Sequence, residues 1–116
     1  MYNSKINKLN ILINSLPYKY WDIKTQIEYI QRRIIIYCII YYELNDNIVE
    51  DKTYDEFANY LVELKNKYPD VYKTTEYYYC LRDFDKSTGF YIYDKLNEHD
   101  KVKLMNIAKY VLRLRG

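Results

Sequence analysis

Turn-forming residues are scarce in this chain, whose 116 residues include only two glycines and two prolines. Few turn formers predict long secondary-structure elements joined by short connections. The two glycines, Gly89 and Gly116, lie far apart, which excludes the glycine-rich loops that cradle phosphates in nucleotide-binding enzymes. The sequence "STG" at 87–89 offers two hydroxyls to a phosphate, but a turn with Gly89 at positive φ explains it as well, and we favour the turn.

Residue types that carry catalysis or bind metals are also few. His99 is the single histidine, and Cys38 and Cys80 are the two cysteines, 42 positions apart. They cannot form a zinc site of the usual kind, and neither a GxSxG nor an HExxH motif is present. We expect His99 to be a solvated surface residue and both cysteines to be reduced packing residues. The sequence therefore predicts that the chain is not an enzyme.

Long apolar runs and a strong charge of one sign are missing too. The longest apolar run, "IIIYCIIYY" at 34–42, is less than half of the roughly 20 residues that span a bilayer. The first 21 residues lack the apolar core of a signal peptide, so we expect a cytoplasmic protein that does not enter membranes. A net charge of +2 is too weak to imply nucleic-acid binding. The C-terminal basic residues are more simply a solvated helix face: Lys101, Lys103, Lys109, Arg113 and Arg115.

A helical period in the apolar residues is the main pattern that is present. Between Asp22, a plausible N-cap, and about Leu44, apolar residues recur in steps of three and four. This stripe consists of Ile23, Ile27, Ile30, Ile34, Cys38 and Tyr41. The β-branched residues at 34–40 leave a buried strand as the alternative, but the length of the pattern favours a central, buried helix.

Similar patterns predict further helices along the chain. We expect them at about 4–16, from Asp51 as N-cap to the residues before Pro69, from Thr74 or Thr75 to about 84, and from Asn97 as N-cap onward. Alternation in "FYIYD" allows one short β element near 88–93. Residues 1–116 are therefore predicted to form one mainly α domain, a small helical bundle built on a central helical hairpin.

The stretch "YYELNDNIVEDKTYDEF" at 41–57 combines six acidic residues and four aromatic residues with a single lysine. Part of the acidity has a simple cause, because carboxylates in the first turn of a helix interact favourably with the helix dipole. The alternating ligands and the glycine of a calcium-binding EF-hand loop are missing. Tyr41 lies across a short corner from Tyr54 and Asp55. Aromatic faces and carboxylates together suit a flat cationic ring that bears sugar hydroxyls.

This stretch and its continuation "LVELKNKYPD" resemble the N-terminal helical domain Ia of bacterial NAD-dependent DNA ligases, over about residues 25–70. Residues that match that family in type and spacing are Tyr41, Asp51, Tyr54 and Asp55, while Tyr42 stands where the family has histidine. The resemblance implies that these five positions contact the nicotinamide mononucleotide (NMN) half of NAD. The Lys-x-Asp-Gly motif that ligation requires is absent, as are the ligase zinc finger and helix–hairpin–helix elements, so the chain alone should not ligate DNA.

The expected function is therefore non-catalytic binding. Ile, Lys, Asn and Tyr, which have AT-rich codons, supply nearly half of the chain and indicate a low-GC bacterium or one of its mobile elements. We expect a small ligase-related protein, encoded by such a mobile element, that acts by protein–protein contact. One alternative is a module that binds NMN or NAD, and another is a phage inhibitor of a host defence system such as CRISPR. The apolar central helix and the many tyrosines also suit a homodimer.

Overall fold

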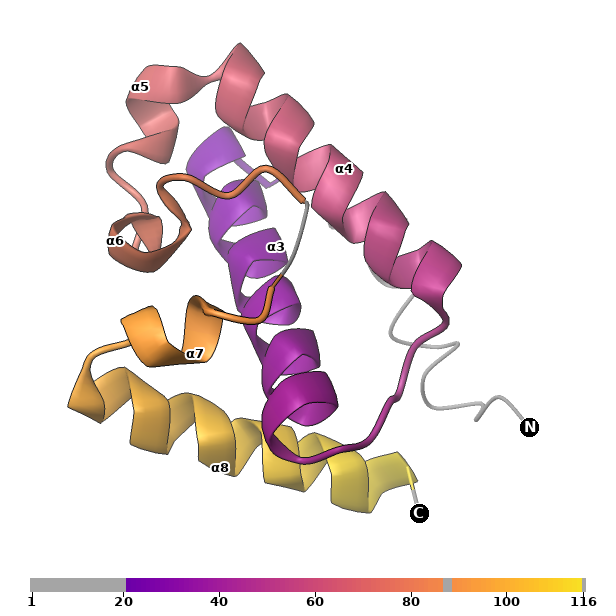
Figure 1. Cartoon of the computed structure of the whole chain (residues 1–116). Coiled ribbons are helices and arrows are strands. Elements are labelled where there is room, and N and C mark those ends of the chain that lie inside the picture. Colours follow the sequence, from indigo (N-terminus) through magenta and orange to yellow (C-terminus); the bar gives the residue numbers. More distant parts are fainter. Residues whose placement is uncertain (1–20, 87–88, 116) are drawn as a thin grey trace.

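Helix α3 (Ile23–Cys38) runs through the middle of the molecule, and the other helices are arranged around it (Figure 1). The computed structural model describes residues 21–86 and 89–115. Asp22 caps the start of α3, since its Oδ1 accepts a hydrogen bond from Thr25 N at 2.7 Å, as predicted. The apolar stripe of α3 is fully buried at Ile27, Ile30 and Ile34. The central, buried helix is thereby confirmed.

Five further α-helices complete the described fold. The π-helical turn η1 (Ile39–Glu43) continues α3 without a break, and the loop at 44–50 leads into α4 (Asp51–Lys67). The remaining helices are α5 (Pro69–Tyr72), α6 (Tyr78–Leu81), α7 (Ile92–Lys95) and α8 (Glu98–Arg115). Helix α3 packs against α4, α5, α7 and α8. Helices α3 and α4 run in opposite directions, which is the hairpin predicted within 25–70 (Figure 1).

The mainly α prediction is confirmed, but the short β element near 88–93 is wrong. Over 89–93 the chain forms a turn, in which Ile92 N donates to Gly89 O at 3.1 Å, followed by the start of α7. A strand needs a neighbouring strand to pair with, and the described residues contain none. The helix predicted at 4–16 lies outside the described residues.

Three helix starts show how local polar groups act in this fold. Asn97 caps α8 as predicted, with its Oδ1 accepting from Asp100 N at 2.7 Å. Asp51, predicted as the N-cap of α4, is instead its first residue, and Glu50 occupies the cap position, where its side chain makes no capping hydrogen bond to the helix start. Thr75 does not cap α6, because its hydroxyl is buried and donates to Tyr72 O at 2.6 Å. The same hydroxyl oxygen accepts from Gln31 Nε2 at 2.8 Å and so joins α3 to the segment after α5.

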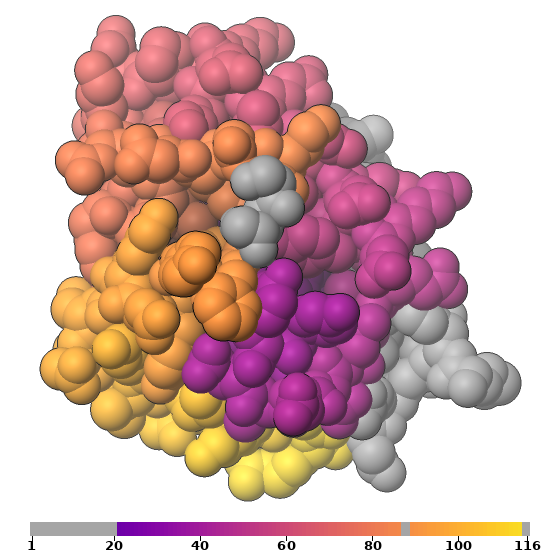
Figure 2. All heavy atoms as spheres, viewed as in Figure 1, coloured from indigo at the N-terminus to yellow at the C-terminus, as the bar shows by residue number. Residues whose placement is uncertain are grey.

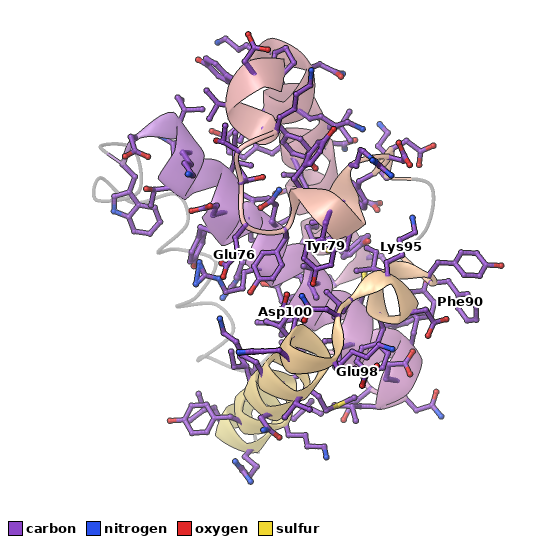
Figure 3. All side chains as sticks on the ribbon, turned by 90° about the vertical axis from the view of Figure 1, so that its left-hand side faces the viewer. Glu76, Tyr79, Phe90, Lys95, Glu98 and Asp100 are labelled. Carbon is purple, nitrogen blue, oxygen red and sulfur yellow. The ribbon has the colours of Figure 1, made fainter. Side chains whose placement is uncertain are left out.

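Helix α6 is tied to the beginning of α8 by a tyrosine. Tyr79 donates its hydroxyl hydrogen to Asp100 Oδ2, and its oxygen accepts from Asn97 N at 3.2 Å. Figure 3 shows Tyr79 on α6 and Asp100 on α8 close to each other, where the two helices meet. These contacts fix one end of α8, and the packing of α8 against α3 and η1 fixes its course beyond.

Candidate functional site

The helix type changes where the chain reaches the predicted binding residues. At η1, Leu44 N donates to Ile39 O at 3.1 Å, five residues back, instead of the usual four. The turn keeps Ile39 and Ile40 in the core, and Tyr41 is 54% exposed. Asn45, with a φ of 53°, then ends the helix in the left-handed conformation that asparagine tolerates. The apolar stripe that we extended to Tyr41 therefore stops before it, and the wide turn directs Tyr41 to solvent.

A pocket of about 190 Å³ lies between the end of α3, η1, the following loop and the start of α4. We call it the tyrosine pocket; its walls are Tyr37, Cys38, Tyr41, Tyr42, Asn47, Val49, Asp51 and Tyr54. Four of the five predicted binding residues are among these, and the exception is Asp55, an exposed residue of α4 outside the wall. The structure therefore brings together four of the five residues that the resemblance to ligase domain Ia had grouped.

Two protonated groups form a close contact in the wall. Cys38 Sγ and Tyr54 Oη lie 3.5 Å apart. Burial raises the pKa of the Cys38 thiol to about 11, although the hydrogen bond with Tyr54 acts in the opposite direction. Burial, with smaller contributions from Cys38 and other neighbours, raises the pKa of the Tyr54 hydroxyl well above its ordinary value. Both groups stay neutral near pH 7, so neither supplies the anionic nucleophile that covalent chemistry would need.

Gly89 packs directly behind this contact. A Cβ added at Gly89 would lie 2.2 Å from Cys38 Sγ and 3.2 Å from Tyr54 Oη. Gly89 does precede a turn, since its carbonyl accepts from Ile92 N, but it has no positive φ, which corrects our expectation for this angle. Its role is close approach: the absence of a side chain allows the segment after 88 to lie against α3 and α4.

That close approach sets a row of aromatic rings beside the pocket. The ring centroids are 4.9 Å apart for Tyr41–Tyr42, 5.4 Å for Tyr42–Phe90 and 5.0 Å for Phe90–Tyr91, all in edge-to-face geometry. We call Tyr41, Tyr42, Phe90 and Tyr91 the aromatic ridge. In Figure 2 the orange atoms near residue 90 lie against the purple atoms near residue 40, and Phe90 stands at the rim of the molecule in Figure 3.

Sequence reasoning predicted only two of the four ridge residues, Tyr41 and Tyr42, as site residues. Phe90 is 51% and Tyr91 60% exposed, and both fall in the segment whose alternation allows a short β element. Their aromatic character was a usable signal, but local patterns do not show that they meet residues almost 50 positions earlier. Only the tertiary contact between Tyr42 and Phe90 reveals the continuous surface.

An open depression of about 660 Å³ adjoins the tyrosine pocket. It shares Tyr41, Tyr42 and Asn47 with the pocket and is also lined by Asn45, Asp46 and Phe90. Among the described residues that line the two hollows, Asp46 and Asp51 are acidic and none is basic. The local charge therefore favours a neutral or cationic ligand over an anionic one.

The basic residues of α8 have neighbours of their own. Lys101 Nζ lies 3.6 Å from Glu98 Oε1, and Lys103 Nζ lies 3.9 Å from Glu76 Oε2. Arg113 lies over the ring of Tyr110, with its Cζ 5.9 Å from the centroid. These contacts support the interpretation of a solvated helix face.

No group of three or more His, Cys, Asp or Glu side chains in residues 21–86 and 89–115 is placed to hold a metal ion. None of the helices formed by those residues combines the length and the apolar character needed to cross a membrane.

Comparison of the chain with protein-family models, curated proteins and solved structures gives no match. The resemblance to ligase domain Ia therefore stays a prediction from the sequence.

Proposed function

We propose that this chain is a non-catalytic binding protein that holds a protein partner on the aromatic ridge, with the tyrosine pocket as the recess beside it. The observation that supports this most strongly is the contact between four exposed rings that come from two segments far apart in the sequence. Aromatic residues are enriched in protein interfaces, where they contribute a large area at low entropic cost. The edge-to-face contacts also order the rings before a partner arrives.

The size of the exposed area is consistent with this function. An aromatic side chain buries about 150–250 Å² when it is covered, and the four ridge residues are between 36% and 60% exposed. A partner that covered the ridge would therefore remove about 400 Å² from water. This area corresponds to about 10 kcal/mol before the costs of association are subtracted. Contiguous apolar patches of this size on a monomer are often functional.

Photo-cross-linking tests this proposal directly. A benzoylphenylalanine replacing Tyr91 should capture a specific protein from the native host, and one replacing exposed Lys73, beyond α5 and outside both hollows, should not. The captured protein is then purified and its affinity measured. We expect Tyr91→Ala to weaken binding at least tenfold and Tyr110→Ala, which removes a ring of similar exposure on α8, to leave it unchanged.

Several outcomes would overturn or redirect the proposal. Equal losses for Tyr91→Ala and Tyr110→Ala would show that the ridge is not the interface. Cross-links between two copies of this chain would make the ridge the surface of a homodimer instead. A host defence complex, such as a CRISPR effector, is the partner class that we propose to examine first among captured proteins, because the coding composition indicates a mobile element.

A second candidate function is binding of a nicotinamide nucleotide in the tyrosine pocket. It is favoured by the position of Tyr41, Asp51 and Tyr54 in one pocket wall, as the ligase resemblance implies. The pocket volume of about 190 Å³ is below the roughly 300–1,000 Å³ of typical small-molecule sites, so it accommodates one ring and leaves the sugar in the open depression. The acidic lining disfavours the phosphate of NMN and the diphosphate of NAD.

Calorimetry distinguishes this candidate. If the pocket binds nicotinamide nucleotides, nicotinamide riboside, which lacks the phosphate, should bind more tightly than NMN, and Tyr54→Phe should alter binding of both. The absence of heat with riboside, NMN and NAD at millimolar concentration would exclude the nucleotide.

A further inference from the structure

The walls of the tyrosine pocket combine aromatic rings with a single formal charge. Four of the lining residues are tyrosines, and Asp51, an exposed residue at the start of α4, is the one charged side chain among the described residues that line it. The floor adds no charge, since the Cys38 thiol and the Tyr54 hydroxyl are both protonated near pH 7. Asn47 contributes an amide whose Oδ1 accepts from Val49 N at 3.3 Å.

This combination is complementary to a cation with a flat face. Aromatic rings attract a cation held over them, and a carboxylate at the rim gives that cation a counter-ion. A docked partner would cover the rim and remove water, which strengthens both interactions. From this charge complementarity and from the position of the pocket beside the aromatic ridge, we propose that the tyrosine pocket receives an arginine side chain of the protein partner. The inference rests on the proposed function.

Arginine fits the pocket better than lysine for geometric reasons. A guanidinium is planar, stacks on rings and can bind a carboxylate through two parallel hydrogen bonds, whereas an ammonium is a strongly hydrated point charge. A volume of about 190 Å³ suits one long side chain and not a whole peptide segment. The chain itself shows the arrangement nearby: Arg33 Cζ lies 5.2 Å from the ring centroid of Tyr37 and 5.7 Å from that of Phe57.

Nuclear magnetic resonance titration with blocked tripeptides tests the pocket chemistry. The probes are acetyl-Gly-Xaa-Gly-amide, where Xaa is arginine, lysine or citrulline, the last being a neutral side chain of nearly the same shape as arginine. We expect the arginine peptide to shift the backbone amide signals of Tyr41, Asp51 and Tyr54 at millimolar concentration. The lysine peptide should bind several-fold more weakly, and the citrulline peptide should produce no saturable shift. Equal binding of arginine and citrulline peptides, or no binding of either, would overturn the inference.

A matched pair of variants tests the counter-ion. Asp51→Asn should weaken binding of the arginine peptide at least fivefold. Asp70→Asn should leave it unchanged, since Asp70 is also an exposed carboxylate in the first turn of a helix but lies on α5, outside the pocket. Both substitutions are at exposed positions, and the amide spectra of the free variants report whether the fold is kept. An unchanged affinity of the Asp51→Asn variant would contradict the assigned role of Asp51.

The same variants separate this inference from the proposed function when the captured partner is used. If Tyr91→Ala weakens binding of the partner and Asp51→Asn does not, the ridge is the interface and the arginine assignment is wrong. If neither substitution matters, the proposed function itself fails. If both substitutions weaken binding of the partner, the arginines of the partner are replaced one at a time. One of these replacements should weaken binding to the native chain but cause no further loss of affinity for the Asp51→Asn variant.

Discussion

The close approach of Gly89 to Cys38 predicts a substitution whose effect depends on a second residue. An alanine at Gly89 would place its Cβ 2.2 Å from Cys38 Sγ, well inside van der Waals contact. Cys38 is buried on the central helix, and its sulfur is only one bond from Cβ, so it has little freedom to move away. Overpacking of this kind costs about 1–3 kcal/mol. Because Gly89 has no positive φ, alanine also restricts the unfolded chain, which returns about 0.4–1 kcal/mol.

The net expectation for Gly89→Ala is a decrease of up to about 2.6 kcal/mol in the free energy of unfolding. In a Cys38→Ala background the atom at 2.2 Å is gone, and the next contacts are 3.2 Å to Tyr54 Oη and 3.4 Å to the Cβ of residue 38. The same substitution should then be close to neutral or slightly stabilising. Urea denaturation of the wild type, both single variants and the double variant, followed by circular dichroism, measures this coupling. An equal cost of Gly89→Ala in both backgrounds would refute the packing that we describe.

Three further predictions concern polar groups and thiols. Thr75→Val removes the acceptor of the buried Gln31 amide and should cost about 1–3 kcal/mol in urea denaturation, whereas adding Gln31→Leu should recover most of it. Asn97→Ala should cost about 1 kcal/mol because α8 loses its cap, and Asn97→Asp should keep most of that stability in thermal unfolding. Burial raises the pKa of Cys38 to about 11 and that of Cys80 to about 12, so the folded chain holds both protons more tightly than the unfolded chain. The corresponding stability is complete below the ordinary thiol pKa of 9.0 and is lost as the pH rises towards 11–12, which urea midpoints measured against pH would show. Rapid reaction of either thiol of the folded protein with Ellman's reagent at pH 8 would contradict this burial.

Local patterns predicted those parts of the fold that depend on residues close in sequence. The three-and-four spacing of isoleucines gave α3, and Asp22 and Asn97 cap helices through bonds to backbone amides three residues ahead. Gln31 falls on the same stripe as Ile27 and Ile34, which was a signal of a buried polar contact, but its partner Thr75 is 44 residues away. Such a contact forms only when the helices pack.

The candidate site shows the same division. The resemblance to ligase domain Ia grouped Tyr41, Asp51 and Tyr54, and all three line one pocket because the short loop after η1 returns the chain directly into α4. Alternation in the sequence could not show that Phe90 meets Tyr42, since that contact depends on Gly89 fitting against the central helix. The π turn was also unpredicted, because the apolar residues keep a spacing of three and four up to Tyr41, and this pattern indicates one continuous α-helix.

The most direct test of the central claim uses the partner that cross-linking identifies, purified on its own. Its affinity is measured for two variants that each remove one exposed tyrosine ring. Tyr41 belongs to the ridge and Tyr110 lies on α8, and each is 54% exposed. Titration of the partner should show at least tenfold weaker binding for Tyr41→Ala and wild-type binding for Tyr110→Ala. Wild-type affinity of the Tyr41→Ala variant would contradict the account.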